Sequence, residues 1–214
     1  MMQPVGRPRK AGLEAALILA AEELVLEHGF SAVSVEAVAA RAGTSRPAFY
    51  RRFSGVPALI FALLAQRFEI TLDVDFDFGN LRLDLEAIQH EQAGLFGDPL
   101  IARSLAGFLD CLHGDSELRS VFVEQFLGPR RAAVGIIIDR AARRGEIPPC
   151  PDVEWICDLL TGPVVLRVVM PGLAALDESF ISHTVASALS ALDYQTPEGA
   201  TLFVAGTHRP YAGP

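Results

Sequence analysis

The residues best suited to chemistry in this chain of 214 residues lie between Ser34 and Phe53. The second half of that segment carries two cations, a phenol and a flat apolar ring: Arg46, Pro47, Tyr50 and Arg51. An arginine can donate two parallel hydrogen bonds to guanine in the DNA major groove, and small apolar groups can contact the thymine methyl. These side chains are therefore suited to reading base edges. The alternative is an ordinary surface helix whose cations are merely solvated.

Two short helices joined by a tight turn would position these side chains. We expect the first helix at about 35–42 and the second at 46–53, with Ser34 and Ser45 as their N-caps. Gly43 lies where the first helix must end and the chain must reverse, a position that requires a positive φ. Two helices joined by a Gly-containing turn form a helix-turn-helix, which places its second helix in the major groove.

The second helix needs an anchor on its other face. Phe49 and Phe53 are four residues apart, so they share one face and should pack into the core, while the cations point away. A supporting helix is expected from about Gly12 to His28, ended by Gly29, because its leucines and alanines recur at helical spacing. The three helices together would form a small DNA-binding domain.

The segment resembles the DNA-binding domain of TetR-family transcriptional regulators. The residues that carry the resemblance are Ser34, Val38-Ala39, Ala42-Gly43, Thr44-Ser45, Phe49-Tyr50 and Phe53. One position departs from the pattern, since Val56 stands where many members carry a lysine that contacts phosphate. The candidate DNA contacts are Arg7, Arg9, Ser34, Thr44, Ser45, Arg46, Pro47, Tyr50 and Arg51.

The charge distribution favours a DNA partner for the N-terminal part only. Residues 1–53 carry seven cations against five glutamates, whereas the remainder carries eleven arginines against twenty-one acids. Such an asymmetry is a recognised sign of nucleic-acid binding. We expect residues 1–10 to form a flexible basic arm, in which Arg7 and Arg9 enter a minor groove or neutralise phosphates; the alternative is a solvated terminus that does neither.

Composition and missing motifs exclude several other classes. The three cysteines (Cys111, Cys150 and Cys157) form no CxxC pair, and no run of 18 apolar residues occurs, so we expect a reduced, cytoplasmic chain that does not span a membrane. The sequence contains no GxSxG, no Gly-rich phosphate loop and no HExxH. We therefore expect no enzyme activity, no cofactor and no metal.

After the helix-turn-helix the pattern is helical throughout, and we predict an all-α fold. The predicted organisation is a flexible basic arm at 1–10, a helix-turn-helix domain at 11–56, a linking helix at about 55–70, an effector-binding and dimerisation domain at 71–192, and a loose tail at 193–214. Glycine and proline residues divide the part at 71–192 into helices at 81–93, 98–113, 116–126, 129–144, 152–171 and 177–192. Such amphipathic stretches are typical of a helical bundle.

The resemblance implies a ligand pocket among the middle helices, where filling it would shift the linking helix and release DNA. Candidate ligand contacts are Phe108, Cys111, Phe122, Phe126, Trp155 and Leu159. An apolar pocket with a few polar groups is the usual small-molecule site. These aromatic residues could equally be ordinary core, since a bundle of this size needs an aromatic interior.

The resemblance also implies a homodimer formed through the last two helices. Candidate interface residues are Val164, Val168, Ile181, Val185, Ala188 and Leu192, although this stripe could instead face its own core. We therefore expect a dimeric repressor of double-stranded DNA that is released from a palindromic operator by a small, largely apolar effector. The alternative is an architectural or constitutive DNA-binding protein of the same fold that responds to no small molecule.

Overall fold

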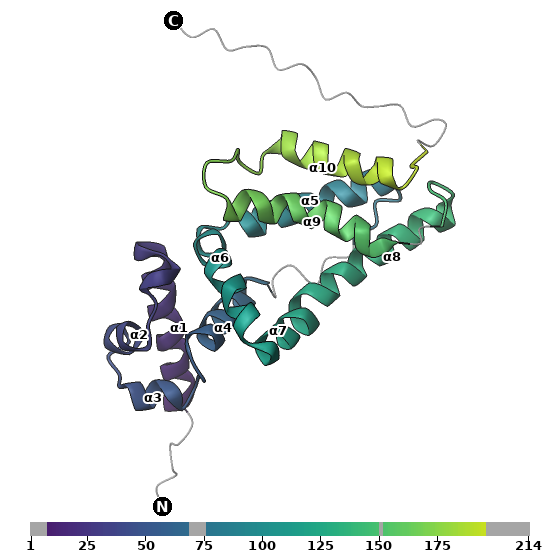
Figure 1. The fold of residues 1–214 in the computed structure, drawn as a ribbon. Helices are drawn as coiled ribbons and strands as arrows, with labels where there is room; N and C mark the ends of the chain where they lie inside the picture. Colours follow the sequence, from purple (N-terminus) through teal and green to yellow (C-terminus); the bar gives the residue numbers. More distant parts are fainter. Residues whose placement is uncertain (1–7, 69–75, 150–151, 196–214) are drawn as a thin grey trace, which may run out of the picture.

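The structure, a computed structural model, describes residues 8–68, 76–149 and 152–195, and in these ranges it is helical and contains no strand (Figure 1). The prediction of an all-α fold is confirmed. Arg7, residues 69–75 and the tail from 196 onward lie outside the described residues, so the predictions made for them stay predictions.

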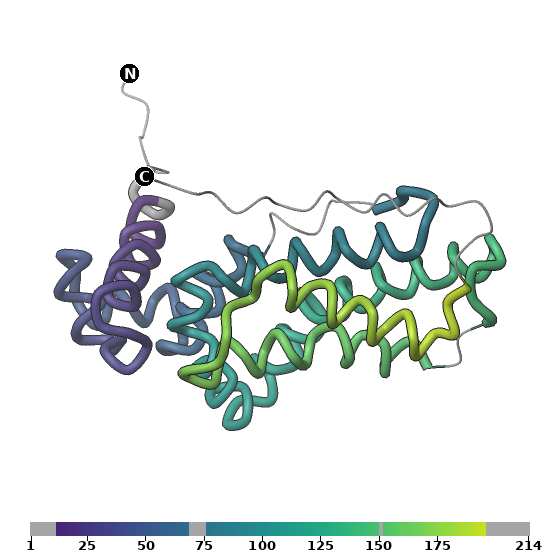
Figure 2. Tube along the Cα trace, turned by 90° about the horizontal axis from the view of Figure 1, so that it is seen from above, coloured from purple at the N-terminus to yellow at the C-terminus, as the bar shows by residue number. Residues whose placement is uncertain are grey.

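The N-terminal helices form a lobe at one end of the molecule (Figures 1 and 2). This lobe contains α1 (Pro8–His28), the short 3-10 helix η1 (Phe30–Ala32), α2 (Val35–Arg41) and α3 (Arg46–Tyr50). Helix α1 begins at Pro8 rather than near Gly12, so Arg9 belongs to its first turn and not to a flexible arm. Helix α3 ends at Tyr50 and not at Phe53, which makes it shorter than the sequence predicts.

The remaining helices form the body. They are α4 (Val56–Phe68), α5 (Leu81–Gly97), α6 (Pro99–Gly114), α7 (Ser116–Phe122), the π-helix η3 (Val123–Leu127), α8 (Gly128–Arg144), α9 (Val153–Val169) and α10 (Glu178–Ala191). Helix α4 packs against α1 on one side and α6 on the other, so it joins the lobe to the body. Helices α5, α8, α9 and α10 pack together in the part of the body remote from the lobe (Figure 2).

Of the breaks expected from glycine and proline, one lies later in the chain and another is absent. Gly94 lies inside α5, which continues to Gly97, so the break before α6 falls at Asp98. The Gly128-Pro129 pair does not separate two helices, because the π-helix η3 joins α7 to α8. Pro129 has no amide N–H, so this continuous helix lacks one backbone hydrogen bond at that position. A π-helical turn inside a helix accommodates an extra residue and often marks a functional site.

The body also extends beyond its predicted end at 192. Asn80 donates from Nδ2 to the Tyr194 hydroxyl at 3.1 Å, and the Gln195 amide donates to the Glu146 carbonyl at 2.9 Å. Residues 193–195 are therefore held against the start of α5 and the end of α8. The prediction of a loose tail is wrong for these three residues.

Candidate nucleic-acid interface and regulatory site

The turn between α2 and α3 has the geometry of a helix-turn-helix. The Ser34 hydroxyl accepts from the Ala37 amide at 3.1 Å, so it caps α2 as predicted. Gly43 has a φ of 62°, the left-handed conformation that the sequence required of it. Ser45 precedes α3 in an extended conformation, but its side chain makes no capping hydrogen bond. Ser45 therefore occupies the N-cap position of α3 but does not stabilise the helix through its side chain.

Helix α3 is anchored by aromatic packing. Phe49 is fully buried, and its ring lies 5.9 Å from that of Phe53 and 5.5 Å, edge to face, from that of Tyr50. Because Phe49 and Phe53 are buried, they hold the short helix against the lobe, as the spacing predicts. The opposite side of α3 is left for contacts outside the protein.

That opposite side is the recognition face, which we define as the exposed side chains Arg46, Pro47, Tyr50 and Arg51. Ser34 and Ser45 are also exposed, and Thr44 is half-buried at the turn. The fold thus gathers the predicted base-reading residues on one short helix, with the turn residues beside them.

Two arginines of the lobe form ion pairs in different places. Arg41 Nη1 lies 2.8 Å from Glu27 Oε2 and 3.6 Å from Glu23 Oε2, so it ties α2 to α1. Arg46 Nη1 lies 2.7 Å from Glu36 Oε1, a pair in which both side chains are 59% exposed. This pair joins α2 to α3, and no local pattern in the sequence indicates that Glu36 contacts the recognition face.

The aromatic residues predicted to bind a ligand form a connected cluster inside the body. Phe108 is fully buried, stacked on Phe61 of α4 at 6.1 Å and edge to face with Phe122 at 5.6 Å. Phe126 continues the cluster, 4.9 Å from Phe122 and 3.7 Å from Phe68 at the end of α4. The cluster therefore connects α6 and η3 to the linking helix.

Two predicted ligand residues lie elsewhere. Trp155 is 54% exposed on α9, and Leu159 lines an open groove between α9 and α10. Neither residue lines the cavity among α5, α8 and α9 that is described below. Cys111 is half-buried on α6 and is a free thiol, and burial raises its pKa.

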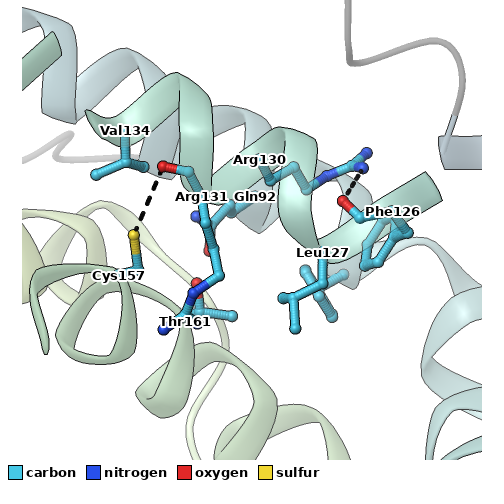
Figure 3. Close-up of a pocket in the computed structure, with 9 residues that line it drawn as sticks. Gln92, Phe126, Leu127, Arg130, Arg131, Val134, Cys157 and Thr161 are labelled. Atoms are coloured by element: carbon cyan, nitrogen blue, oxygen red, sulfur yellow. Dashed lines mark hydrogen bonds between the residues drawn. The ribbon is translucent and has the colours of Figure 1, made fainter. Parts of the chain in front are cut away.

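A small cavity lies among α5, α8 and α9, and Phe126 is the predicted ligand residue that lines it (Figure 3). Its volume is about 30 Å³, roughly the room for one water molecule. Gln92 and Thr161 supply polar groups to its wall, and Arg130 and Arg131 supply cations. Cys157, also in the wall, has its pKa raised to about 11 by burial, so its thiol stays protonated near neutral pH.

Arg130 connects this cavity to the linking helix. Its guanidinium lies 3.9 Å from the centroid of the Phe126 ring and donates to the carbonyls of Phe126 at 3.2 Å and Phe68 at 2.9 Å. Phe68 is the last residue of α4, so Arg130 satisfies a helix-terminal carbonyl. Burial lowers the pKa of Arg130 to about 10, which still leaves it charged at neutral pH.

The lobe contacts α4 and α6 of the body directly. Arg67 of α4 pairs with Glu22 of α1 at 2.7 Å and lies 3.9 Å from Asp98, the N-cap of α6. The Phe30 ring of η1 fits against Gly107 of α6 so closely that a Cβ atom there would lie 2.2 Å from it. Movement of α4 or α6 would therefore reach the lobe through these contacts.

The predicted dimer residues need correction. The single chain already buries Val164, Ile181, Val185, Ala188 and Leu192 among its own helices, and Val168 is half-buried. The five buried side chains have almost no surface left for a partner, whereas a partner contact of Val168 stays a prediction. The stripe that the sequence revealed is the inward face of the two helices.

The outward face of the same helices has a different composition. We call its exposed apolar side chains the outer stripe: Trp155 and Leu166 of α9, with Met170 and Leu173 after it. Small residues of α10 lie beside it, and a groove of about 360 Å³ runs between the two helices. Exposed apolar patches of this kind mark interaction surfaces.

The described residues hold no group of three or more His, Cys, Asp or Glu side chains placed to bind a metal ion. Among the helices that the structure describes, none is both long and apolar enough to span a membrane.

Comparisons with known proteins match both parts of the chain. The sequence model of the bacterial regulatory proteins of the tetR family matches residues 17–63, and that of the tetracyclin repressor-like C-terminal domain matches residues 76–188. Both models describe transcriptional regulators, and together they cover the lobe and nearly the whole body.

Relatives of full length support the same grouping. The chain is 28% identical to the uncharacterized HTH-type transcriptional regulator YdeS of Bacillus subtilis, over 90% of this chain and 96% of that protein. It is also 28% identical to the DNA-binding transcriptional repressor TetR of Mycobacteroides abscessus, over 83% and 92% of the two chains.

Solved structures share the fold at lower identity. A bacterial regulatory protein in the tetR family from Rhodococcus RHA1 superposes with a TM-score of 0.65 at 18% identity, covering 86% of this chain and 98% of that one. FadR from Bacillus subtilis, in complex with stearoyl-CoA, gives 0.58 at 20% identity, covering 84% and 95%.

Proposed function

This chain belongs to the TetR family of helix-turn-helix transcriptional regulators and is not an enzyme, and on that premise we propose a specific mode of action. It binds a two-fold symmetric operator as a homodimer, represses transcription there, and leaves the operator when a small, largely apolar ligand enters the body. The recognition face carries the sequence preference.

One observation carries the proposal, namely the division of α3 into a buried and an exposed side. Phe49 fixes the helix in the lobe, while Arg46, Tyr50 and Arg51 stay exposed on its other side. A short helix that presents arginines beyond a rigid anchor can place them against base edges in the major groove. Pro47 adds an apolar ring able to contact a thymine methyl.

The outer stripe is the proposed dimer contact. Trp155, Leu166 and Met170 are each about half exposed in the single chain, and small α10 residues such as Ala186 and Ser187 would let a partner helix approach closely. A C2 contact of α9 and α10 pairs each patch with its own copy. The two recognition faces would then meet half-sites about 34–36 Å apart.

The cavity among α5, α8 and α9 is the proposed point of entry for the ligand. It is too small for an effector as it stands, so a ligand would have to push its wall apart. Arg130 forms part of that wall and bonds the last carbonyl of α4, so opening the cavity would loosen the linking helix. Contacts of α4 with the lobe would then change the position of α3.

Selection of bound sequences from a randomised duplex tests the DNA-binding proposal. The full chain should enrich an inverted repeat whose two half-sites lie about one helical turn apart. Enrichment of no sequence would overturn the proposal, and enrichment of a single unrepeated half-site would overturn the dimeric mode. The enriched duplex then serves as the probe for every variant.

A constitutive DNA-binding protein of the same fold is the second candidate. The water-sized volume of the cavity favours it, because an effector site would ordinarily be larger. The discriminating experiment is anisotropy of the selected duplex against a panel of apolar ligands. Release by one ligand supports the regulated mode, and an Arg130→Met variant should shift the concentration at which release occurs.

A further inference from the structure

The pair between Glu36 and Arg46 is an unusual feature of a surface that must meet a polyanion. A carboxylate beside the recognition face is repelled by phosphates, so it weakens attachment to any DNA. The pair also gives little stability, because exposed ion pairs typically contribute about 0–1 kcal/mol. Both side chains are 59% exposed here, and the Arg46 Nη1 to Glu36 Oε1 distance is nevertheless 2.7 Å.

The geometry points to a positioning role: we propose that Glu36 orients the guanidinium of Arg46 for one base and thereby sets the sequence preference of α3. This inference rests on the proposed function and adds a residue of α2 to the recognition machinery. Glu36 itself contacts Arg46 and not the base.

The donor inventory of arginine allows both contacts at once. A guanidinium carries five N–H donors in a planar fork, and the bond to Glu36 uses one nitrogen, Nη1. The other nitrogens remain available for the O6 and N7 acceptors of guanine, which arginine contacts by two parallel bonds. Fixing one edge of the fork removes rotamers that would point it at a phosphate.

Two elements support the carboxylate itself. Glu36 lies in the first turn of α2, where the helix dipole favours a negative charge, and Ser34 caps that same turn. Helix α2 packs against α1 and buries Val38 and Ala39, so apolar packing holds its backbone in place. The oxygen that meets Arg46 is therefore held by a rigid element and not by a mobile loop.

The repulsion between the Glu36 carboxylate and DNA phosphates also contributes to the sequence preference. The carboxylate repels phosphates equally at every sequence, so it weakens non-specific binding. At the correct sequence that repulsion is offset by an Arg46 that is already aligned. Specificity is a difference of affinities. A repulsive group increases this difference when the repulsion is compensated at one target and at no other.

The Glu27–Arg41 pair offers a matched control in the same lobe. Glu27 is about as exposed as Glu36 and forms a comparably short pair, but with an arginine outside the recognition face. Removing either carboxylate changes the lobe charge by the same amount. A difference between the two variants therefore reports on position and not on charge.

The test measures a specificity ratio, the affinity for the selected duplex over that for a duplex changed at the base pair that Arg46→Ala relaxes. We expect Glu36→Ala to lower this ratio tenfold or more, while affinity for unrelated DNA rises. Glu36→Gln keeps an acceptor oxygen without charge and should fall between the wild type and Glu36→Ala. Glu27→Ala should raise both affinities alike and leave the ratio unchanged.

The double variant decides the mechanism. In an Arg46→Ala background, Glu36→Ala should change the ratio no further, because the residue to be positioned is absent. An unchanged ratio in the single Glu36→Ala variant, or an equal fall in both backgrounds, would overturn the inference while leaving the proposed function intact. A wild type without any sequence preference would overturn both.

Discussion

The lobe and the body of this molecule differ in how far apart in the sequence their functional contacts lie. In the lobe, anchor, turn and recognition face all fall within residues 34–53, and each side chain follows from helical spacing over a few residues. In the body, the cavity joins Gln92 of α5 to Arg130 of α8 and Cys157 of α9. Local chemistry can specify the first arrangement, whereas only tertiary packing specifies the second.

The difference shows in the role of aromatic residues. Phe49 in the lobe has one task, since it is buried and holds a short helix. In the body, by contrast, Phe108, Phe122 and Phe126 form a cluster that contacts Phe68 of the linking helix. The proposed mode of action uses both features, because a ligand in the body would have to move a recognition helix that does not itself deform.

The largest predicted effect concerns the anchor of the lobe. Phe49→Ala should lower the free energy of unfolding by about 3–5 kcal/mol, because it leaves a cavity where the ring was buried. Tyr50→Ala next to it should cost less than about 1.5 kcal/mol, the loss of one edge-to-face contact on an exposed ring. Chemical denaturation measures both.

In DNA binding, the two variants should differ in how the loss arises, because only Tyr50→Ala leaves the anchor of α3 in place. Tyr50→Ala should weaken binding to the selected duplex in a chain that is still folded, as judged by circular dichroism. Equal destabilisation by the two changes would show that α3 lacks the buried and exposed sides described above.

The next effect concerns the body. Leu166→Glu places a charge in the outer stripe and should raise the dimer dissociation constant by roughly 30-fold, corresponding to about 2 kcal/mol for a central interface residue. Leu19→Glu is the control, because Leu19 is 56% exposed on α1 and Leu166 is 53% exposed on α9. Light scattering across a dilution series measures the molar mass of each variant in solution, and so distinguishes monomer from dimer.

A monomeric Leu166→Glu chain beside a dimeric Leu19→Glu chain would support the corrected interface. An unchanged dimer in both variants would place the contact elsewhere on the body.

The smallest effect separates two serines that look alike in the sequence. Ser34→Ala should cost about 1 kcal/mol of stability, because its hydroxyl accepts from the Ala37 amide. Ser45→Ala should change stability by less than about 0.5 kcal/mol, since its side chain makes no capping bond. Thermal melts of the two variants compare them directly, and equal shifts would contradict the assigned caps.

Sequence reasoning succeeded where a residue's role depends on its near neighbours. The Ser34 cap, the positive φ of Gly43 and the burial of Phe49 were all predictable, because each follows from helix geometry. The amphipathic stretches and the glycine and proline between them predicted the all-α fold, which the structure confirms. The Glu36–Arg46 contact was not predictable, because it depends on how α2 crosses α3.

The same reasoning failed where two faces of a helix are both apolar. Helix α9 carries Val164 on its inward side and Leu166 on its outward side, so periodicity alone could not tell core from interface. Proline and glycine misled for a related reason. Gly128-Pro129 reads as a break, but a π-helical turn carries the chain through it, and neighbouring helices decide that outcome.

The most direct test of the central claim compares one arginine from each region. Arg46→Ala on the recognition face and Arg143→Ala in the last turn of α8 remove the same charge from exposed positions. Anisotropy with the selected duplex should show a loss of about 1–3 kcal/mol for Arg46→Ala, with relaxed preference at one base pair, and no such relaxation for Arg143→Ala. A uniform loss across all sequences, or an equal loss from both variants, would contradict the assignment of base reading to α3.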